Sequence, residues 1–260
     1  MAGQPKYPIY IVSKGRAYNP MTAKIFEGAG IDYYIVVEPQ EEQEYIQALS
    51  KERVLVLPFA NLGLGSFPAR NWCWEHSMKN GHEKHWIFDD NIQAFGKWQG
   101  GKRRKAPQVK DAIIYVETFS DSNDIDISGF EEHNFSQRPP KKPFKINCHV
   151  YSTLLIKTNL PYRWRLKYNE DVDLCLQVLH NGGITASCVY YLADKVSTSD
   201  KMKGGNQTEL YQGNDPKKKL LKAKMLQSVW PQYVKVVIRF GRFHHLIDWK
   251  FFSKKNKQNG

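Results

Sequence analysis

The sequence lacks a long apolar run. None of its apolar stretches approaches the roughly 20 residues that are needed to span a bilayer. The first residues, Met-Ala-Gly-Gln-Pro-Lys, also lack the apolar core of a signal peptide. We therefore expect neither a membrane segment nor secretion, and the sequence predicts a cytoplasmic protein.

Cysteine is scarce and scattered along the chain. No two of the four cysteines form a Cys-X-X-Cys pair, which argues against the usual zinc clusters and thiol-redox motifs. We expect reduced thiols, most of them buried. The four are Cys73, Cys148, Cys175 and Cys188.

Acidic residues are too few to balance the basic ones. The chain has 38 Lys and Arg against 26 Asp and Glu, a formal net charge of +12. Such an excess favours a polyanionic partner, nucleic acid or less often anionic lipid, although a merely basic surface would give the same composition. The basic residues gather in runs near aromatic residues, as in nucleic-acid footprints. One run follows Gly100-Gly101 and consists of Lys102, Arg103, Arg104 and Lys105.

The first ninety residues alternate strand-like and helix-like segments. Helix starts are indicated at Asn19-Pro20, with Asn as cap and Pro at the first helical position, and near Glu41 and Ser66. Such alternation is typical of an α/β protein whose parallel sheet has right-handed crossovers. Ligands bind such sheets beyond the carboxyl ends of the strands. The predicted strands cover residues 7–12, 33–37, 54–57 and 85–88.

The rest of the chain is less regular. A helix over 169–182 is clear, because Val172, Cys175, Leu176 and Leu179 share one face and Asn169 is a good cap. The remaining expectations are a mobile loop over 97–110, a second loop over 129–145, strands over 145–157 and 184–192, a basic helix over 215–229, and a β-rich segment over 233–249.

An acidic triplet, Asp89-Asp90-Asn91, follows the fourth predicted strand. A diphosphate leaving group gains negative charge as a sugar bond breaks, and a Mn²⁺ or Mg²⁺ ion bound by oxygen ligands can neutralise it. Asp and Asn are also common where strands simply turn. The position of the triplet after four alternating strands favours a metal and diphosphate site over a turn.

Two acids, Glu170 and Asp171, open the helix predicted over 169–182. Acids in a first turn complement the helix dipole, so helix stability alone would explain them. Alternatively, one carboxylate acts as the general base that takes a proton from an acceptor hydroxyl. The residues alone leave both interpretations open.

Two later motifs contain further candidate ligands. Arg242 could hold a phosphate, and His244 or His245 could supply a nitrogen ligand to a metal. Gly204-Gly205-Asn206 fits a loop that closes over a substrate, or a simple turn.

Taken in order, these motifs resemble those of the TET-associated glycosyltransferases, predicted and phage-encoded enzymes that add sugars to hydroxymethylated bases in DNA. The resemblance runs over most of the chain. It is carried by Tyr-Ile-Val-Ser-Lys-Gly-Arg at 10–16, Val-Val-Glu-Pro at 36–39, Arg-Asn-Trp at 70–72, Asp-Asp-Asn at 89–91, Asn-Cys at 147–148, Val-Tyr-Ser at 150–152, Tyr-Arg-Trp-Arg at 162–165, Tyr-Asn-Glu-Asp at 168–171, Asp-Leu at 173–174, Gly-Gly-Asn at 204–206, Phe-Gly-Arg at 240–242 and His-His at 244–245.

The resemblance implies a GT-A fold with a Rossmann-like nucleotide-binding half and an acceptor half that share a sheet. We place these halves at 1–96 and 97–250, with a basic tail over 251–260. The implied donor is a nucleotide-sugar, most often a UDP-sugar, used with a divalent metal. The implied acceptor is 5-hydroxymethylcytosine or a related pyrimidine in phage DNA, inside an infected bacterial host.

The resemblance also assigns roles to residues. Asp171, or else Glu170, would be the catalytic base, and the metal would be held within the set Asp90, Asn91, His244 and His245. The final Asn of the triplet departs from the usual Asp-X-Asp, so the division of labour inside it stays open. The nucleotide-sugar would contact Ser13, Lys14, Arg16, Glu38, Arg70, Asp89, Asp90, Gly204, Gly205, Asn206 and Arg242.

DNA would need a separate surface. A base inside a duplex is out of reach and must be flipped out or presented on a single strand. Besides the basic run at 102–105, Arg163, Trp164 and Arg165 are candidate contacts, and Trp98 is a second candidate for stacking; each Trp taken singly is more typical of a core. Two other hypotheses are a GT-A enzyme that acts on a glycan, protein or lipid, and a non-catalytic DNA-binding module.

Overall fold

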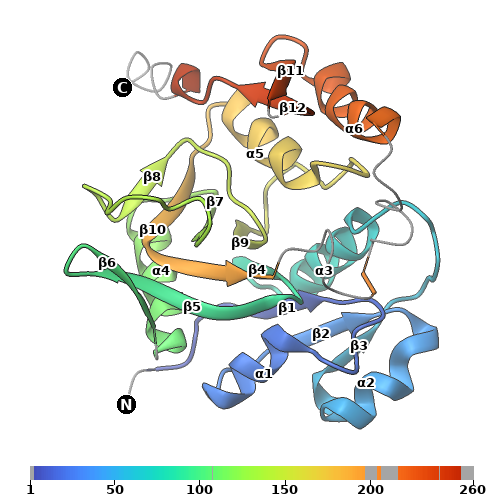
Figure 1. Cartoon of the computed structure of the whole chain (residues 1–260). Helices are drawn as coiled ribbons and strands as arrows, with labels where there is room; N and C mark the ends of the chain where they lie inside the picture. The colour runs from blue at the N-terminus through green and yellow to red at the C-terminus, as the bar shows by residue number, and fades with distance from the viewer. Residues whose placement is uncertain (1–2, 107, 197–203, 206–215, 240, 253–260) are drawn as a thin grey trace.

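The computed structural model describes residues 3–106, 108–196, 204–205, 216–239 and 241–252 (Figure 1). Within them, helices pack on both faces of one large mixed sheet, which confirms the predicted α/β class with a mixed central sheet. No described helix is both long and apolar enough to cross a membrane.

The first part of the chain has the predicted alternating order. β-Branched and aromatic residues fill its central strands, which are buried and parallel. Val12 pairs with Asp89, so the carboxyl ends of two of these strands meet at one edge of the sheet. The elements are β1 (Ile9–Val12), α1 (Met21–Gly28), β2 (Tyr34–Val37), the 3₁₀ turn Pro39–Glu41, α2 (Glu42–Ala48), the 3₁₀ turn Lys51–Arg53, β3 (Val54–Val56), α3 (Phe67–Lys79) and β4 (Lys84–Asp89).

Two predicted helix caps differ from the structure. Helix α1 begins at Met21 with Pro20 in the cap position, so Asn19 is one residue too early to cap it. Asn169 does precede α5 (Glu170–His180), but in a left-handed conformation, and its side chain donates a hydrogen bond to the carbonyl of Lys222 instead of capping the helix.

Beyond β4 the sheet contains strands of both directions. β9 (Thr153–Lys157) is antiparallel to both β4 and β7 (Ile127–Glu132), and β10 (Thr185–Lys195) is parallel to β7. Strands from both predicted halves therefore form one sheet, and residue 96 lies inside β5 (Ile92–Gln99). The order is β3-β2-β1-β4-β9-β7-β10-β5-β6, and β8 (Phe144–Ile146) pairs with β10.

The loop predicted over 97–110 is wrong, and the loop predicted over 129–145 is correct only for residues 133–143. Most of residues 97–110 belongs to a hairpin of β5 and β6 (Lys102–Lys105), which turns at two glycines with positive φ. Every residue of β6 is exposed, so its composition is that of a loop although its backbone pairs. Residues 129–145 include most of the buried strand β7. Gly129 allows the chain to pass close to β9, because a Cβ there would lie 1.8 Å from the carbonyl oxygen of Thr153.

The helices form a layer on each face of the sheet. Helices α1, α2 and α4 (Val109–Ser122) pack against one face, around Phe26, Tyr45 and Ile113. Helices α3 and α5 pack against the other face, around Trp74 and Cys175. Helix α4 was not predicted. The expectation of reduced thiols is confirmed: three of the four free cysteines are buried and Cys148 is partly buried.

A small C-terminal module packs on α5, at the top of Figure 1. It consists of α6 (Pro216–Val229), as predicted, and a hairpin of β11 (Val234–Arg239) and β12 (Arg242–Ile247). The predicted basic tail lies mostly outside the described residues. Asp173 of α5 is fully buried beneath the module and accepts hydrogen bonds from Arg165, Gln177 and the indole of Trp230, at 2.7–3.3 Å.

We expect Asp173→Ala to destabilise the fold. The change leaves the buried indole N–H of Trp230 without its acceptor and removes one of the two acceptors of the Gln177 amide, which should lower the free energy of unfolding by about 2–3 kcal/mol. Urea unfolding followed by tryptophan fluorescence measures this. Asp32→Ala is the control, because its ion pair with Arg53 is exposed and should contribute well under about 1 kcal/mol. Equal midpoints for the two variants would contradict the role of Asp173.

Candidate functional site

A cavity of about 320 Å³ lies at the carboxyl ends of β1, β2 and β4. It is closed on the other side by the start of α5 and the end of β10, so both halves of the chain contribute to it. The position is the one expected for a ligand on a parallel α/β sheet. Twelve residues predicted from the sequence line it: Ser13, Lys14, Arg16, Glu38, Arg70, Asp89, Asp90, Asn91, Glu170, Asp171, Gly205 and His245.

Side chains of the loop after β1 bind Asp90 of the acidic triplet. The hydroxyl of Ser13 donates to Asp90 Oδ2 at 2.6 Å, and Arg16 forms a buried ion pair with the same carboxylate. The backbone N–H of Arg16 donates to the hydroxyl of Tyr45 at 3.1 Å. Asp90 is 4% exposed, and both of its oxygens are occupied by these donors. Its role here is to hold the loop in shape.

Lys14 and Glu38 form the polar wall of the cavity, with Lys14 Nζ 3.1 Å from Glu38 Oε1. Burial raises the pKa of Glu38, but hydrogen bonds from Gln40 and Lys14 outweigh burial and lower it. Glu38 is therefore ionised at neutral pH, and it can accept hydrogen bonds from ligand hydroxyls.

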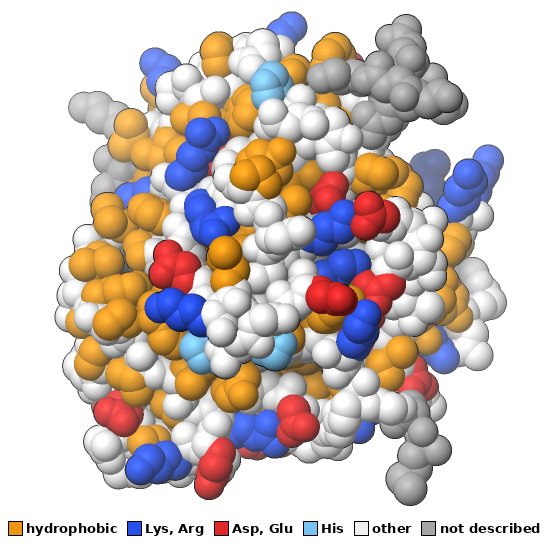
Figure 2. Space-filling view, turned by 180° about the vertical axis from the view of Figure 1, so that it is seen from behind, with side chains coloured by type: hydrophobic (Ala, Val, Ile, Leu, Met, Phe, Trp, Pro, Cys, Tyr) orange, Lys and Arg blue, Asp and Glu red, His pale blue; other side chains and the backbone are white. Residues whose placement is uncertain are grey.

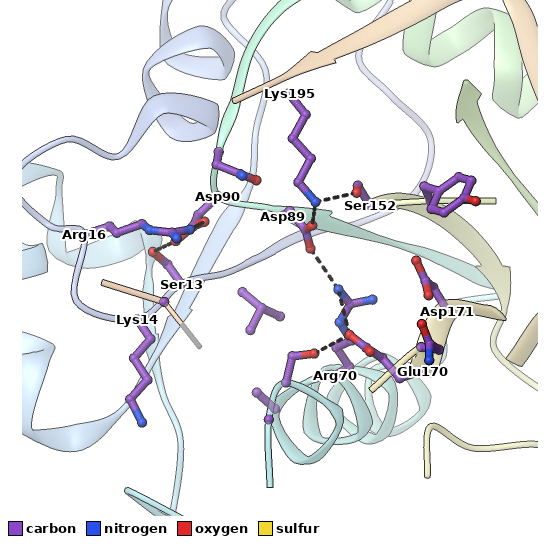
Figure 3. A pocket seen from close by; sticks show the side chains of 18 of the residues that line it. Ser13, Lys14, Arg16, Arg70, Asp89, Asp90, Ser152, Glu170, Asp171 and Lys195 are labelled. Carbon is purple, nitrogen blue, oxygen red and sulfur yellow. Dashed lines mark hydrogen bonds and ion pairs between the residues drawn. The ribbon is translucent and has the colours of Figure 1, made fainter. Parts of the chain in front are cut away.

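Arg70, in the first turns of α3, lies at the centre of the cavity between Asp89 and Glu170 (Figure 3). Its Nη2 donates to Asp89 Oδ1 at 2.8 Å and lies 3.7 Å from Glu170 Oε1, and the guanidinium stacks on Trp164. The residue is only 5% exposed, yet its Nε and Nη1 have no hydrogen-bond partner among the residues that the structure describes. Buried, unpaired N–H groups are costly. Two such donors on a planar cation suit a phosphate or another oxyanion.

The lining residues that were not predicted include Lys195, Ser152, Glu132 and Lys222. Lys195 Nζ lies 2.6 Å from Asp89 Oδ2 and donates to the hydroxyl of Ser152 at 2.7 Å, and that hydroxyl donates to Glu132 at 3.0 Å. Ser152 has a φ of 56°, a strained value that places both its hydroxyl and its carbonyl at the site.

Two of these residues were missed because the predicted element limits were wrong. Strand β10 was expected to stop at Leu192, three residues before Lys195, and Glu132 was assigned to a loop. A search for polar residues at the true carboxyl ends of β7 and β10 would have found both.

The two acids at the start of α5 have different surroundings. Glu170 accepts a hydrogen bond from Ser66 at 2.7 Å, and burial raises its pKa despite the nearby Arg70. Burial also raises the pKa of Asp171, but the attraction of His149 and Arg70 outweighs it and lowers that pKa well below its usual range. His149 Nε2 lies 3.4 Å from Asp171 Oδ2. Asp171 is therefore ionised at neutral pH.

Three of the four metal ligands predicted from the sequence, Asp90, Asn91 and His245, line the cavity, but their surroundings are not those of a metal site. Asp90 is occupied by Ser13 and Arg16, and Asn91 donates to the carbonyl of Val196. Neighbouring side chains on a strand point to opposite faces, and His245 lines the cavity whereas His244 does not. Among the described residues no group of three His, Cys, Asp or Glu side chains has the geometry of a metal site. The cations that contact the triplet are protein side chains, so these residues do not fit the predicted metal ion.

Gly204 and Gly205 pack on the loop that contains Ser13. The N–H of Gly205 donates to the carbonyl of Lys14 at 2.7 Å, and Arg16 Nη2 donates to the carbonyl of Gly204 at 3.3 Å. A Cβ at Gly204 would lie 2.3 Å from the carbonyl oxygen of Gly15. Two predicted contacts cannot be placed: Asn206 and the side chain of Arg242 lie outside the described residues.

The predicted DNA contacts fall into two groups. The side chains of Lys102, Arg103, Arg104 and Lys105 are exposed on β6. Trp164 is 1% exposed, so its assignment as a stacking platform is wrong, and Trp98 is also buried. Arg163 and Arg165 bind groups of the protein itself. Arg163 donates to the carbonyls of Leu160 and Tyr162, and Arg165 pairs with Asp173.

Comparison with known proteins gives one family. The family model described as TET-Associated Glycosyltransferase matches residues 7–205. A solved structure described as a putative nucleotide-diphospho-sugar transferase, from Desulfovibrio desulfuricans G20, is similar with a TM-score of 0.38 and 9% identity, over 66% of this chain and 75% of that one. No curated protein matches.

Gly204→Ala should weaken nucleotide binding. The new methyl group would strike the Gly15 carbonyl and displace the loop that carries Ser13 and Arg16, so we expect the Kd for UDP to rise about tenfold in calorimetry. Gly81→Ala is the matched control, because Gly81 also has a positive φ but a methyl group added there would meet no atom within 4 Å. The same Kd for both variants would show that the close packing of the two loops does not shape the site.

Proposed function

The chain belongs to the TET-Associated Glycosyltransferase family, and from that premise we propose that it is a DNA glycosyltransferase. It would move a sugar from a nucleotide-sugar donor, a UDP-sugar, to the hydroxyl of 5-hydroxymethylcytosine or a related modified pyrimidine. Phage DNA is the proposed setting.

The observation that carries the donor assignment is Arg70. A buried guanidinium with two unpaired N–H groups, facing a cavity, suits a diphosphate. Lys195 adds a second positive charge on the other side of Asp89 (Figure 3). The N-terminus of α3, which carries Arg70, adds the partial positive charge of the helix dipole.

Asp171 is the proposed general base. As the acceptor oxygen attacks the anomeric carbon, its proton passes to the Asp171 carboxylate, the bond from that carbon to the donor phosphate oxygen breaks, and the nucleoside diphosphate leaves with the electron pair. A single displacement of this kind inverts the anomeric centre. Asp171 suits the role because it is ionised and lies across the cavity from Asp90 (Figure 3). Glu170 is assigned no proton transfer, because its carboxylate accepts the hydroxyl of Ser66 and lies beside Arg70.

The leaving group needs positive charge, and we assign this role to Arg70 and Lys195. Both side chains are fixed before the reaction by Asp89, so they need little reorganisation as charge develops on the diphosphate. Preorganised charges of this kind are usually a large part of catalysis. The predicted Mn²⁺ or Mg²⁺ ion enters no step of this mechanism, because Asp90 is held by Ser13 and Arg16 and no group of described residues has the geometry of a metal site.

DNA is the proposed acceptor because of where exposed basic residues lie. All four residues of β6 are basic and exposed, on a strand at the edge of the sheet. On the face seen in Figure 2, by contrast, Lys and Arg side chains are interspersed with Asp and Glu. Exposed cations on an edge hairpin suit phosphates of a nucleic-acid backbone.

Sugar transfer to hydroxymethylated DNA tests this function. We expect the protein with a UDP-sugar to convert 5-hydroxymethylcytosine in DNA to a glycosylated nucleoside, detected by mass spectrometry. Asp171→Asn should lower kcat by about 100-fold or more, because it removes the base without changing its shape. Glu170→Gln, its neighbour and matched control, should have a much smaller effect.

The outcomes separate the rival functions. Transfer to a glycan, protein or lipid in place of DNA would leave a glycosyltransferase with another acceptor. DNA binding that is unaffected by Asp171→Asn, without transfer from any donor, would favour a binding module. Equal losses in the two variants would remove Asp171 from its assigned role.

A second prediction concerns the positive charge that would contact the diphosphate. If Arg70 and Lys195 supply it, EDTA should leave most of the transfer rate, whereas Lys195→Met should lower kcat by about 100-fold. Lys79→Met, at an exposed position on α3, is the control for the loss of a lysine. Complete loss of transfer in EDTA, restored by Mn²⁺ or Mg²⁺, would instead assign the charge to a metal ion.

A further inference from the structure

We infer that Phe135 and Tyr151 form the platform on which the acceptor base stacks once it has left the DNA helix. The inference rests on the proposed function and names the part of the chain that meets the acceptor. Neither residue was identified as a site residue from the sequence. Phe135 lies in the segment that follows β7, and Tyr151 lies just before β9.

Phe135 is exposed at the surface, and Tyr151 lies between it and the proposed reacting groups. Phe135 is 52% exposed, and its ring centroid is 5.2 Å from that of Tyr151, with the ring planes at 44°. Tyr151 lines the cavity together with Glu132 and Asp171. A planar group against these rings would therefore lie beside the proposed base.

The ring of Tyr151 is supported by two further aromatic rings. Tyr151 packs on His149, at 3.4 Å between ring centroids, and His149 stacks on Trp249 at 5.8 Å. His149 is also the residue next to Asp171. One aromatic row therefore positions both the platform and the base, which would set the acceptor hydroxyl relative to Asp171.

The segment that carries Phe135 is hydrogen-bonded to the basic strand β6. Arg103 of β6 donates from Nη1 to the carbonyl of His133 at 2.7 Å, and His133 is two residues before Phe135. The exposed cations of β6 thus lie next to the segment that carries the platform. Phosphates bound along β6 would place the neighbouring nucleotide near Phe135.

A nucleobase fits this arrangement better than a sugar or a peptide does. Every base has a flat face that stacks on aromatic rings, whatever its sequence context, and stacking beside a line of cations is the usual way to hold an unpaired nucleotide. A base must also leave the helix for its hydroxymethyl group to reach Asp171, and the platform would replace the stacking that it loses.

Phe135→Ala tests the platform. On duplex DNA with one 5-hydroxymethylcytosine, we expect KM for DNA to rise about tenfold, the usual effect of losing one stacking partner. KM for the nucleotide-sugar should stay at the wild-type value, and Phe135→Trp should restore KM for DNA. Phe251→Ala is the matched control, because Phe251 is 48% exposed but its ring contacts Tyr233 and Phe252 in the C-terminal module.

The results test the stacking platform and the proposed function separately. If wild-type protein glycosylates the DNA and Phe135→Ala does so with unchanged KM, the platform is refuted and the DNA glycosyltransferase stands. A rise in KM that Phe135→Trp does not reverse would also refute stacking. If the wild-type protein transfers sugar only to acceptors other than DNA, the proposed function fails and the platform fails with it.

Discussion

The buried guanidinium of Arg70 is the charge around which the site is arranged. It lies between Asp89 at the end of β4 and Glu170 at the start of α5, so it joins elements from both halves of the chain. A buried cation needs such partners, since water cannot solvate it. Asp89 in turn holds Lys195 of β10 on its other oxygen. Strands and helices that are distant in sequence thus meet through one set of ion pairs.

This arrangement gives two adjacent acids different chemistry. Glu170 faces Ser66 and Arg70, and burial raises its pKa, whereas Asp171 lies beside His149 and its pKa is lowered. Pairs of carboxylates whose surroundings shift their pKa values apart are typical of catalytic sites. In the proposed reaction the positive side of the cavity takes the diphosphate and Asp171 takes the proton, so the two charges that develop are received by different groups.

The donor side of the site was predictable from the sequence, but the acceptor side was much less so. Regular alternation located the strand ends that carry Ser13, Glu38 and Asp89, because local periodicity is a strong signal in a parallel sheet. Lys195 was missed because β10 is longer than its apolar run. The β5–β6 hairpin was taken for a loop because β6 contains only basic residues, and backbone pairing to a neighbouring strand is not encoded in composition. The burial of Trp164 beneath Arg70 depends on tertiary packing alone.

The central claim is that the unpaired N–H groups of Arg70 bind the diphosphate of a nucleotide-sugar. Calorimetric titration with UDP and with uridine tests it most directly, since the two ligands differ only in the two phosphates. The account predicts that wild-type protein binds UDP at least about tenfold more tightly than uridine, a difference of about 1.4 kcal/mol or more, and that Arg70→Gln loses this preference while remaining folded by circular dichroism. Equal affinities for UDP and uridine in the wild-type protein would contradict the account.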